Sequence, residues 1–218
     1  MRSRHAALPW VAPAMVVLIA LSVYPMFYAV KVSLTNPSGA WTLANFTRLF
    51  QDRLFGVALI QTVVFTGAAL AVEFLLGLAL ALLIDSLTRG KSLFRAGMLV
   101  PMLLPPVVAA VAWRLIYNPQ FGVLNGTLRR MGADTSTLTW TSGDASALAS
   151  VILVDIWEWT PFLFLLLSAG LQAIPHEPIE AARIDGASGW QILRDVTLPL
   201  LKPTILLALL LRAMDLVR

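Results

Sequence analysis

The sequence has no cysteine, little histidine and little charge. The absence of cysteine from all 218 residues excludes disulfides, thiolate nucleophiles and cysteine-based metal sites. With only His5 and His176, a histidine-based metal centre is not expected either. Charged residues make up 13% of the chain, against about 25% in ordinary soluble domains. This scarcity of charge, together with 58% hydrophobic residues, predicts a membrane protein.

Patterns that carry catalysis or nucleic-acid binding are also missing from the sequence. It has no H-E-x-x-H or G-x-S-x-G motif. Gly90-Lys91-Ser92 is the nearest candidate for a phosphate-binding loop, but Asp85 stands where that motif needs its first glycine. The net charge of +4 comes from scattered bases, without a basic stripe interleaved with aromatics. We therefore expect no catalytic residue, no metal or cofactor bound by this chain, and no nucleic-acid partner.

Long apolar runs predict an all-α, polytopic membrane protein, with residues 1–218 forming one transmembrane domain. A spanning helix needs about 20 mostly apolar residues. The runs that meet or approach this length are residues 10–30, 58–84, 96–117, 147–171 and 204–218. Pro101, Pro105 and Pro106 predict a kink or break in the third span. The fifth run is short, and Arg212 and Asp215 interrupt it.

The distribution of basic residues between the loops favours a cytoplasmic N-terminus. The first apolar run is longer than the core of a secretory signal, so we interpret it as a retained span. With the N-terminus inside, the inner segments carry eight Lys and Arg residues against five in the outer segments, a modest bias in the expected direction. The inner residues are Arg2, Arg4, Arg89, Lys91, Arg95, Arg183, Arg194 and Lys202; the outer ones are Lys31, Arg48, Arg53, Arg129 and Arg130.

A polar segment over about residues 175–202 interrupts the apolar pattern on the inner side. Pro178 suits the first turn of a helix over 178–185, and Gly186 is placed to end that helix in a left-handed cap. Ser188 and Gln191 have the spacing of a capping box that starts a second helix. We expect this second helix to end at Leu198, before Pro199, with Trp190 on its packing face.

Charge indicates what this segment binds. Amphipathic helices that lie on lipid headgroups are usually rich in Lys and Arg, whereas residues 171–202 carry more acids than bases. The acidic excess favours a protein partner over a lipid surface. Ala181 and Ala182 are small enough for a partner's backbone to approach closely, and Glu180, Arg183 and Asp185 place charge around them.

The same segment resembles the cytoplasmic loop of the membrane subunits of binding-protein-dependent ABC importers. The matching residues are Glu180, Ala181, Ala182, Gly186, Val196, Leu198 and Pro199. The stretches LLSAGLQAIPHEPIEAARIDGASGW and WRLIYNPQFGVLN are similar to the carbohydrate branch of that family, such as the maltose and glycerol-3-phosphate importers.

This resemblance implies a site and a set of partners. The loop would be the coupling helix that fits an ATP-binding subunit, with Glu180, Ala181, Ala182, Asp185 and Gly186 at the contact. It implies an ATPase dimer that uses ATP and Mg²⁺, a second homologous permease subunit, an extracytoplasmic solute-binding protein, and a place in the bacterial inner membrane. Relatives usually have six spans, so we expect this chain to be truncated at its C-terminus.

Acidic residues inside the predicted spans are candidates for a solute path, because intramembrane charge is costly. Glu73 lies in the second span. Asp155, Glu158 and Trp159 share one helix face in the fourth, where carboxylates beside an indole could bind a sugar. Alternatively, these acids pair with Arg114 or Arg212 and hold the bundle together. A second alternative is an ion-coupled secondary transporter in which Glu73, Asp155 or Glu158 carries protons.

Overall fold

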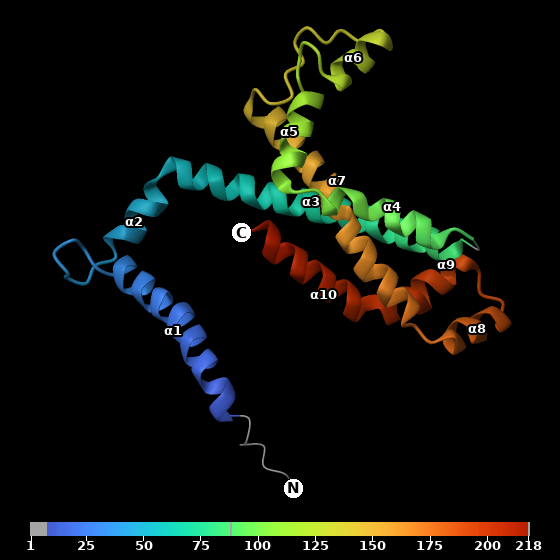
Figure 1. The fold of residues 1–218 in the computed structure, drawn as a ribbon, viewed down its shortest axis with the longest axis horizontal. Helices are drawn as coiled ribbons and strands as arrows, with labels where there is room; N and C mark the ends of the chain where they lie inside the picture. The colour runs from blue at the N-terminus through green and yellow to red at the C-terminus, as the bar shows by residue number, and fades with distance from the viewer. Residues whose placement is uncertain (1–7, 88, 218) are drawn as a thin grey trace. The chain divides into compact units, whose positions relative to one another are not determined.

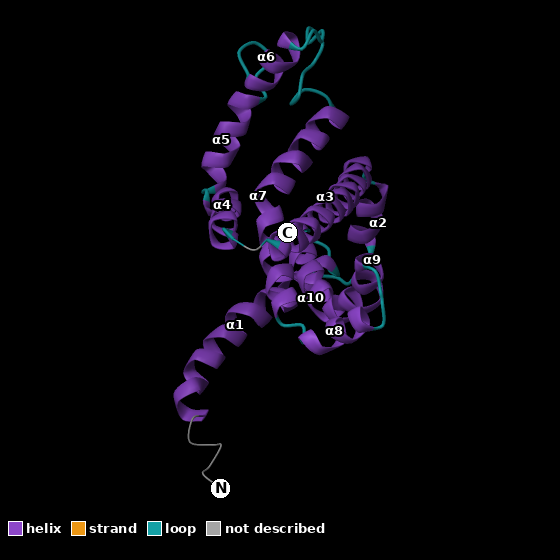
Figure 2. Ribbon diagram, turned by 90° about the vertical axis from the view of Figure 1, so that its right-hand side faces the viewer, coloured by secondary structure: helices purple, strands orange, loops and turns teal. Residues whose placement is uncertain are grey.

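The computed structural model describes residues 8–87 and 89–217, and within them the regular structure is helical apart from one isolated bridge between Thr35 and Trp41. Figure 2 shows these helices joined by short loops. Four helices are long and apolar enough to cross a membrane, and a bent pair that counts as one span makes five. The all-α fold with about five spans is therefore confirmed. Contacts divide the chain into two compact units, residues 1–60 and 61–218.

The first unit contains α1 (Leu8–Ser33), α2 (Ala44–Gln51) and the start of α3 (Arg53–Ser86). Asn45 ties α2 to the end of α1, because its side-chain amide donates to the backbone oxygens of Val32, Ser33 and Thr35 at 3.1–3.3 Å. Every residue from Trp10 to Val32 is exposed. An apolar helix with no buried face is suited to contact lipid or another chain.

The core of the second unit lies where α3, α7 (Asp144–Gln172) and α10 (Leu198–Leu216) meet. Phe164 and Leu167 of α7 pack there against Ala81 of α3 and Leu201 of α10. Small residues allow this approach: a Cβ added to Gly77 would lie 3.1 Å from the Cβ of Leu163. In Figures 1 and 2, α10 runs beside α7 through this region.

The third span is broken, as its prolines predict. α4 (Lys91–Leu103) and α5 (Pro106–Ile116) meet at an angle of 89°, with Leu104 extended between them. Pro105 and Pro106 cannot donate backbone hydrogen bonds, and the residue before a proline avoids the helical region. The short helix α6 (Val123–Arg130) and an irregular segment then lead to α7.

One prediction for the end of the chain is wrong: the second helix of the polar segment does not end at Leu198. Instead α9 (Gly189–Gln191), the π-helix η1 (Ile192–Thr197) and α10 form one helical run, and the span candidate covers Gly189–Leu216. The Leu198 amide donates to the Leu193 carbonyl, five residues back. This wider π turn brings the chain past Pro199 without a break.

Candidate functional site

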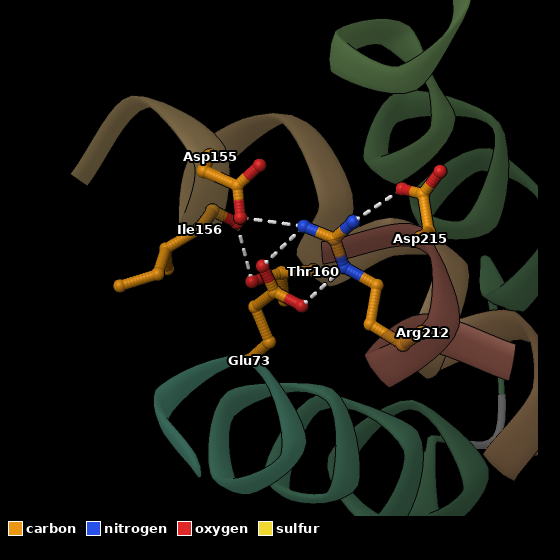
Figure 3. Close-up of polar contacts among 6 residues, drawn as sticks. All are labelled: Glu73, Asp155, Ile156, Thr160, Arg212 and Asp215. Atoms are coloured by element: carbon orange, nitrogen blue, oxygen red, sulfur yellow. Dashed lines mark hydrogen bonds and ion pairs between the residues drawn. The ribbon is translucent and has the colours of Figure 1, made fainter. Parts of the chain in front are cut away.

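The Arg212 guanidinium holds three carboxylates inside the second unit (Figure 3). Its Nε and one terminal nitrogen donate to the two carboxylate oxygens of Glu73, on α3, at 2.8 and 2.9 Å. The same terminal nitrogen donates to Asp155, on α7, at 2.5 Å. The other terminal nitrogen donates to Asp215, on α10 itself, at 2.6 Å. One side chain thus ties together the three helices that form the core.

Exposure is graded across this cluster. The side chains of Glu73 and Arg212 are 0% and 2% exposed, whereas those of Asp155 and Asp215 are 18% and 49% exposed. A buried arginine needs both charge compensation and hydrogen-bond acceptors. The bidentate contact with Glu73 supplies both at the buried end, and the two aspartates supply more acceptors toward the accessible end.

Aromatic rings complete the cluster on α7. The Arg212 guanidinium lies over the indole of Trp159, 4.9 Å from the ring centre, which is a cation–π contact. Trp159 also packs edge-to-face with Phe162 at 6.3 Å. Glu158 is partly buried, and it makes no hydrogen bond or ion pair with any residue in the described ranges.

The structure brings together most of the acids that the sequence singled out. Glu73 and Asp155 pair with Arg212, one of the two partners considered, and Trp159 stacks on the same guanidinium. Arg114 forms no ion pair within residues 8–87 and 89–217. Pairing and solute contact are not exclusive here, because Asp155 and Trp159 remain partly accessible. A role of these residues in a solute path stays a prediction.

Sequence reasoning treated Asp215 only as an interruption of the last apolar run. The structure places it in the cluster. Its spacing of three residues from Arg212 was an available signal, since such pairs share a helix face.

The polar segment folds as helix, tight turn and helix. α8 (His176–Ile184) starts two residues before the predicted Pro178, and Gly186, whose φ is +80°, follows its C-cap residue Asp185. The Gly186 amide donates to Arg183 O at 3.1 Å, and the Ala187 amide donates to Ala182 O at 2.9 Å. These two bonds form a Schellman motif, the left-handed cap that Gly186 predicted.

The predicted capping box at the start of α9 is also present. The Gln191 amide donates to the Ser188 hydroxyl at 3.4 Å, and the Ser188 amide donates to the Gln191 side chain at 2.8 Å. The turn between α8 and α9 is therefore fixed by hydrogen bonds on both sides.

The outer surface of this turn is available to a partner. Glu180, Ala181 and Asp185 are exposed, and Ala182 is partly buried. Ile184 is 86% exposed and Trp190 is 66% exposed. Trp190, which the sequence places on the packing face of this helix, is therefore exposed on the surface of this chain. Large apolar side chains beside charged ones form the kind of surface that a protein interface uses.

The Gly90-Lys91-Ser92 segment is a helix start that follows α3, not a loop that follows a strand. Gly90 has a φ of +79° and precedes α4. The Lys91 ammonium donates to Asp85 O at 2.6 Å and lies 3.7 Å from the Asp85 carboxylate. This lysine caps the end of α3, so nothing about its setting indicates a phosphate site.

The segment over residues 117–143, which is predicted to lie on the outer side and is called the outer segment below, contains a buried asparagine that the sequence did not point to. Asn125 is 0% exposed, and its amide donates to Pro119 O and Leu138 O at 3.1 and 3.4 Å. The Trp140 indole donates to the Asn125 oxygen at 2.7 Å and stacks on Tyr117 at 5.9 Å. Asn125 thus holds the segment between α5 and α7 in a defined shape.

Curated relatives extend the similarity over nearly the whole chain. The trehalose/maltose transport system permease protein MalF of Thermococcus litoralis is 39% identical over 176 residues, which cover 81% of this chain and 59% of the relative. The trehalose transport system permease protein SugA of Mycobacterium tuberculosis is 36% identical over 222 residues, covering 99% of this chain and 70% of the relative. The chain thus spans between about half and three quarters of these relatives' lengths. Neither relative supports the secondary-transporter alternative.

A solved structure and a family model agree with these relatives. The crystal structure of a bacterial alginate ABC transporter, in complex with an alginate pentasaccharide-bound periplasmic protein, contains a chain of the same fold. The TM-score is 0.83 at 23% identity, over 96% of this chain and 72% of that one. The family model matches residues 73–218, which include the Arg212 cluster and the α8–α9 turn. The chain belongs to the family of binding-protein-dependent transport system inner membrane components.

Proposed function

We propose that this chain is a transmembrane subunit of an ATP-driven ABC importer and forms part of the translocation path for a sugar or sugar-like solute. The α8–α9 turn carries this proposal, because it is an exposed, doubly capped surface at the end of the bundle core. The family membership and the sugars named in the relatives' titles support it.

The coupling contact would consist of Glu180, Ala181, Ala182, Asp185 and Gly186. Gly186 adopts the left-handed conformation of the turn. The two alanines have small side chains, so a partner could approach the backbone closely, and the two acids could form ion pairs with a basic partner. The helical run from Gly189 to Leu216 begins directly after this turn. A displacement of the turn would therefore reach α10, which carries Arg212, through the continuous helical run that starts at Gly189.

The solute path would pass the accessible side of the Arg212 cluster. In this proposal Asp155 and Glu158 accept hydrogen bonds from solute hydroxyls, and Trp159 offers its indole face to the sugar ring. Glu73 has a different part, because it is fully buried: it holds Arg212 in place instead of touching the solute.

The partners follow from the same proposal. ATP and Mg²⁺ are used by a separate ATPase dimer, a second permease subunit completes the path, and an extracytoplasmic binding protein delivers the solute. The exposed apolar surface of α1 fits lipid or the second permease subunit. The chain would lie in the bacterial inner membrane with its N-terminus in the cytoplasm.

Co-purification with the ATPase tests this function. The wild-type chain should form a stable complex with the ATPase, and Glu180→Arg should abolish it by reversing a charge at the contact. Asp134→Arg reverses a charge in the outer segment and should leave the complex intact. Solute uptake that continues without ATP but stops when the proton gradient is collapsed would overturn the proposal.

A further inference from the structure

We propose that the Arg212 cluster selects uncharged, hydroxyl-rich carbohydrates and rejects anionic ones such as uronates and sugar phosphates. This inference rests on the proposed function, since it assumes that the solute passes the accessible side of the cluster. The residues that discriminate are Asp155, Glu158 and Asp215.

The charges of the cluster differ in their exposure. The only cation in the cluster is buried, with Arg212 at 2% exposure, whereas Asp155 and Asp215 are 18% and 49% exposed. Figure 3 shows Asp155 and Asp215 on either side of the guanidinium. A solute that approaches from the accessible side therefore meets carboxylates, and the arginine lies behind them.

The Arg212 guanidinium is already hydrogen-bonded within the cluster. Its Nε and both terminal nitrogens donate to Glu73, Asp155 or Asp215 at 2.5–2.9 Å. The Trp159 ring covers one face of the guanidinium. A solute carboxylate or phosphate would have to displace one of these carboxylates before it could form an ion pair.

The cluster contains more acidic than basic side chains. One arginine faces Glu73, Asp155 and Asp215, and Glu158 lies one turn from Asp155 on the same face of α7. The acids outnumber the base, so the electrostatic potential on the side of the cluster that would face the solute is negative. Arg114 lines a different cavity, with Trp113 and Tyr117 near the start of the outer segment, and makes no ion pair with the cluster.

These observations fix the chemistry of a suitable solute. An ionised carboxylate only accepts hydrogen bonds, so its best uncharged partner is a hydroxyl group, which donates. A sugar rich in hydroxyls can satisfy several carboxylates at once. An anionic group cannot donate to them, and at contact distance in this poorly screened setting we expect repulsion to weaken its binding by at least about tenfold.

Direct solute binding to the assembled transporter tests the inference without the binding protein's own selectivity. The permease pair and ATPase are reconstituted in lipid nanodiscs, and binding of radiolabelled trehalose and maltose is compared with that of the same disaccharides oxidised to a uronate at one C6. We expect the neutral sugars to bind at least tenfold more tightly. Equal binding of the uronates would overturn the inference and leave the proposed function standing.

Two neutralising variants test which residues discriminate. Glu158→Gln and Asp215→Asn keep the side-chain size and remove one negative charge each. Each variant should therefore reduce the ratio of neutral-sugar affinity to uronate affinity several-fold. If this affinity ratio is unchanged in both variants, these acids do not discriminate between neutral sugars and uronates, and the inference fails. If neither neutral sugar nor uronate binds to the wild-type complex, the proposed carbohydrate function itself is wrong.

Asp134→Asn is the matched control for these variants. Asp134 lies in the outer segment, where a hydrogen bond from the Ser136 amide at 2.9 Å lowers the pKa of this carboxyl below its ordinary value. It is therefore ionised at neutral pH, and its replacement also removes one full charge. Because it lies outside the cluster, the ratio of sugar to uronate binding should stay at the wild-type value.

Discussion

At the scale of single residues, the cost of charge in an apolar helix determines how Arg212 is placed. α10 reads LLALLLRAMDL around it, and such a side chain is stable only where it is paired. Glu73, which is fully buried, faces it with both carboxylate oxygens. Each of these two groups therefore depends on the other for its compensation.

We predict that Arg212→Gln strongly destabilises the chain, because it leaves Glu73 and Asp155 without their cation. Removing one partner of a buried ion pair costs about 3–5 kcal/mol. The thermal unfolding midpoint of the protein in detergent should fall accordingly. Arg114→Gln is the control: Arg114 is exposed and forms no ion pair with the described residues, so its effect should stay within about 0.5 kcal/mol.

A second variant separates lost pairing from lost packing. Glu73→Gln combined with Arg212→Gln removes both charges and should recover part of the stability. An Arg212→Gln protein as stable as the Arg114→Gln protein would show that the cluster does not hold the bundle together.

Local patterns identified these residues as candidates but did not determine which residues they contact. Intramembrane charge alone identified Glu73, Asp155 and Glu158 as candidates, with pairing to Arg212 as one alternative. The choice between Arg212 and Arg114 depends on how α3, α7 and α10 cross, and the Glu73–Arg212 pair joins residues 139 positions apart. No pattern within one helix contains that information.

At the scale of elements, chain features with purely local causes were predicted well. The Schellman motif at Gly186, the capping box at Ser188 and the break at Pro105 each depend on a few neighbouring residues. The end of the second helix at Pro199 was predicted wrongly. Proline alone predicts a stop, but the π turn of η1 absorbs it, and packing of α10 against α7 stabilises the continued helix.

We predict that Gly186→Ala weakens binding to the ATPase, because a residue with a Cβ costs about 1–2 kcal/mol in the left-handed conformation. This corresponds to roughly tenfold weaker binding if the bound state requires the intact turn. Gly189→Ala is the matched control, three residues away in the same segment. Gly189 has no positive φ and an added Cβ would contact nothing, so its substitution should leave binding unchanged. Equal affinities of the two variants would contradict this role of the turn.

At the scale of the whole molecule, charge placement and helix order together define two sides. The outer segment that holds Asn125 precedes α7, and the α8–α9 turn follows it; α7 contains a span candidate of 27 residues between Ser146 and Gln172. A single crossing separates them, so these two segments must face opposite sides of the membrane. The modest bias of Lys and Arg predicts that the α8–α9 turn lies on the cytoplasmic side.

The absence of cysteine makes this orientation directly testable, because any introduced thiol is the only one in the chain. Glu177, in the first turn of α8, and Ser136, in the outer segment, are both exposed. With a membrane-impermeant maleimide, Ser136→Cys should be labelled in intact spheroplasts and Glu177→Cys only after the membrane is permeabilised. The opposite pattern would place the N-terminus outside and remove the α8–α9 turn from any cytoplasmic ATPase. Labelling of both thiols in intact spheroplasts would mean that α7 does not cross the membrane, which its length and hydropathy argue against.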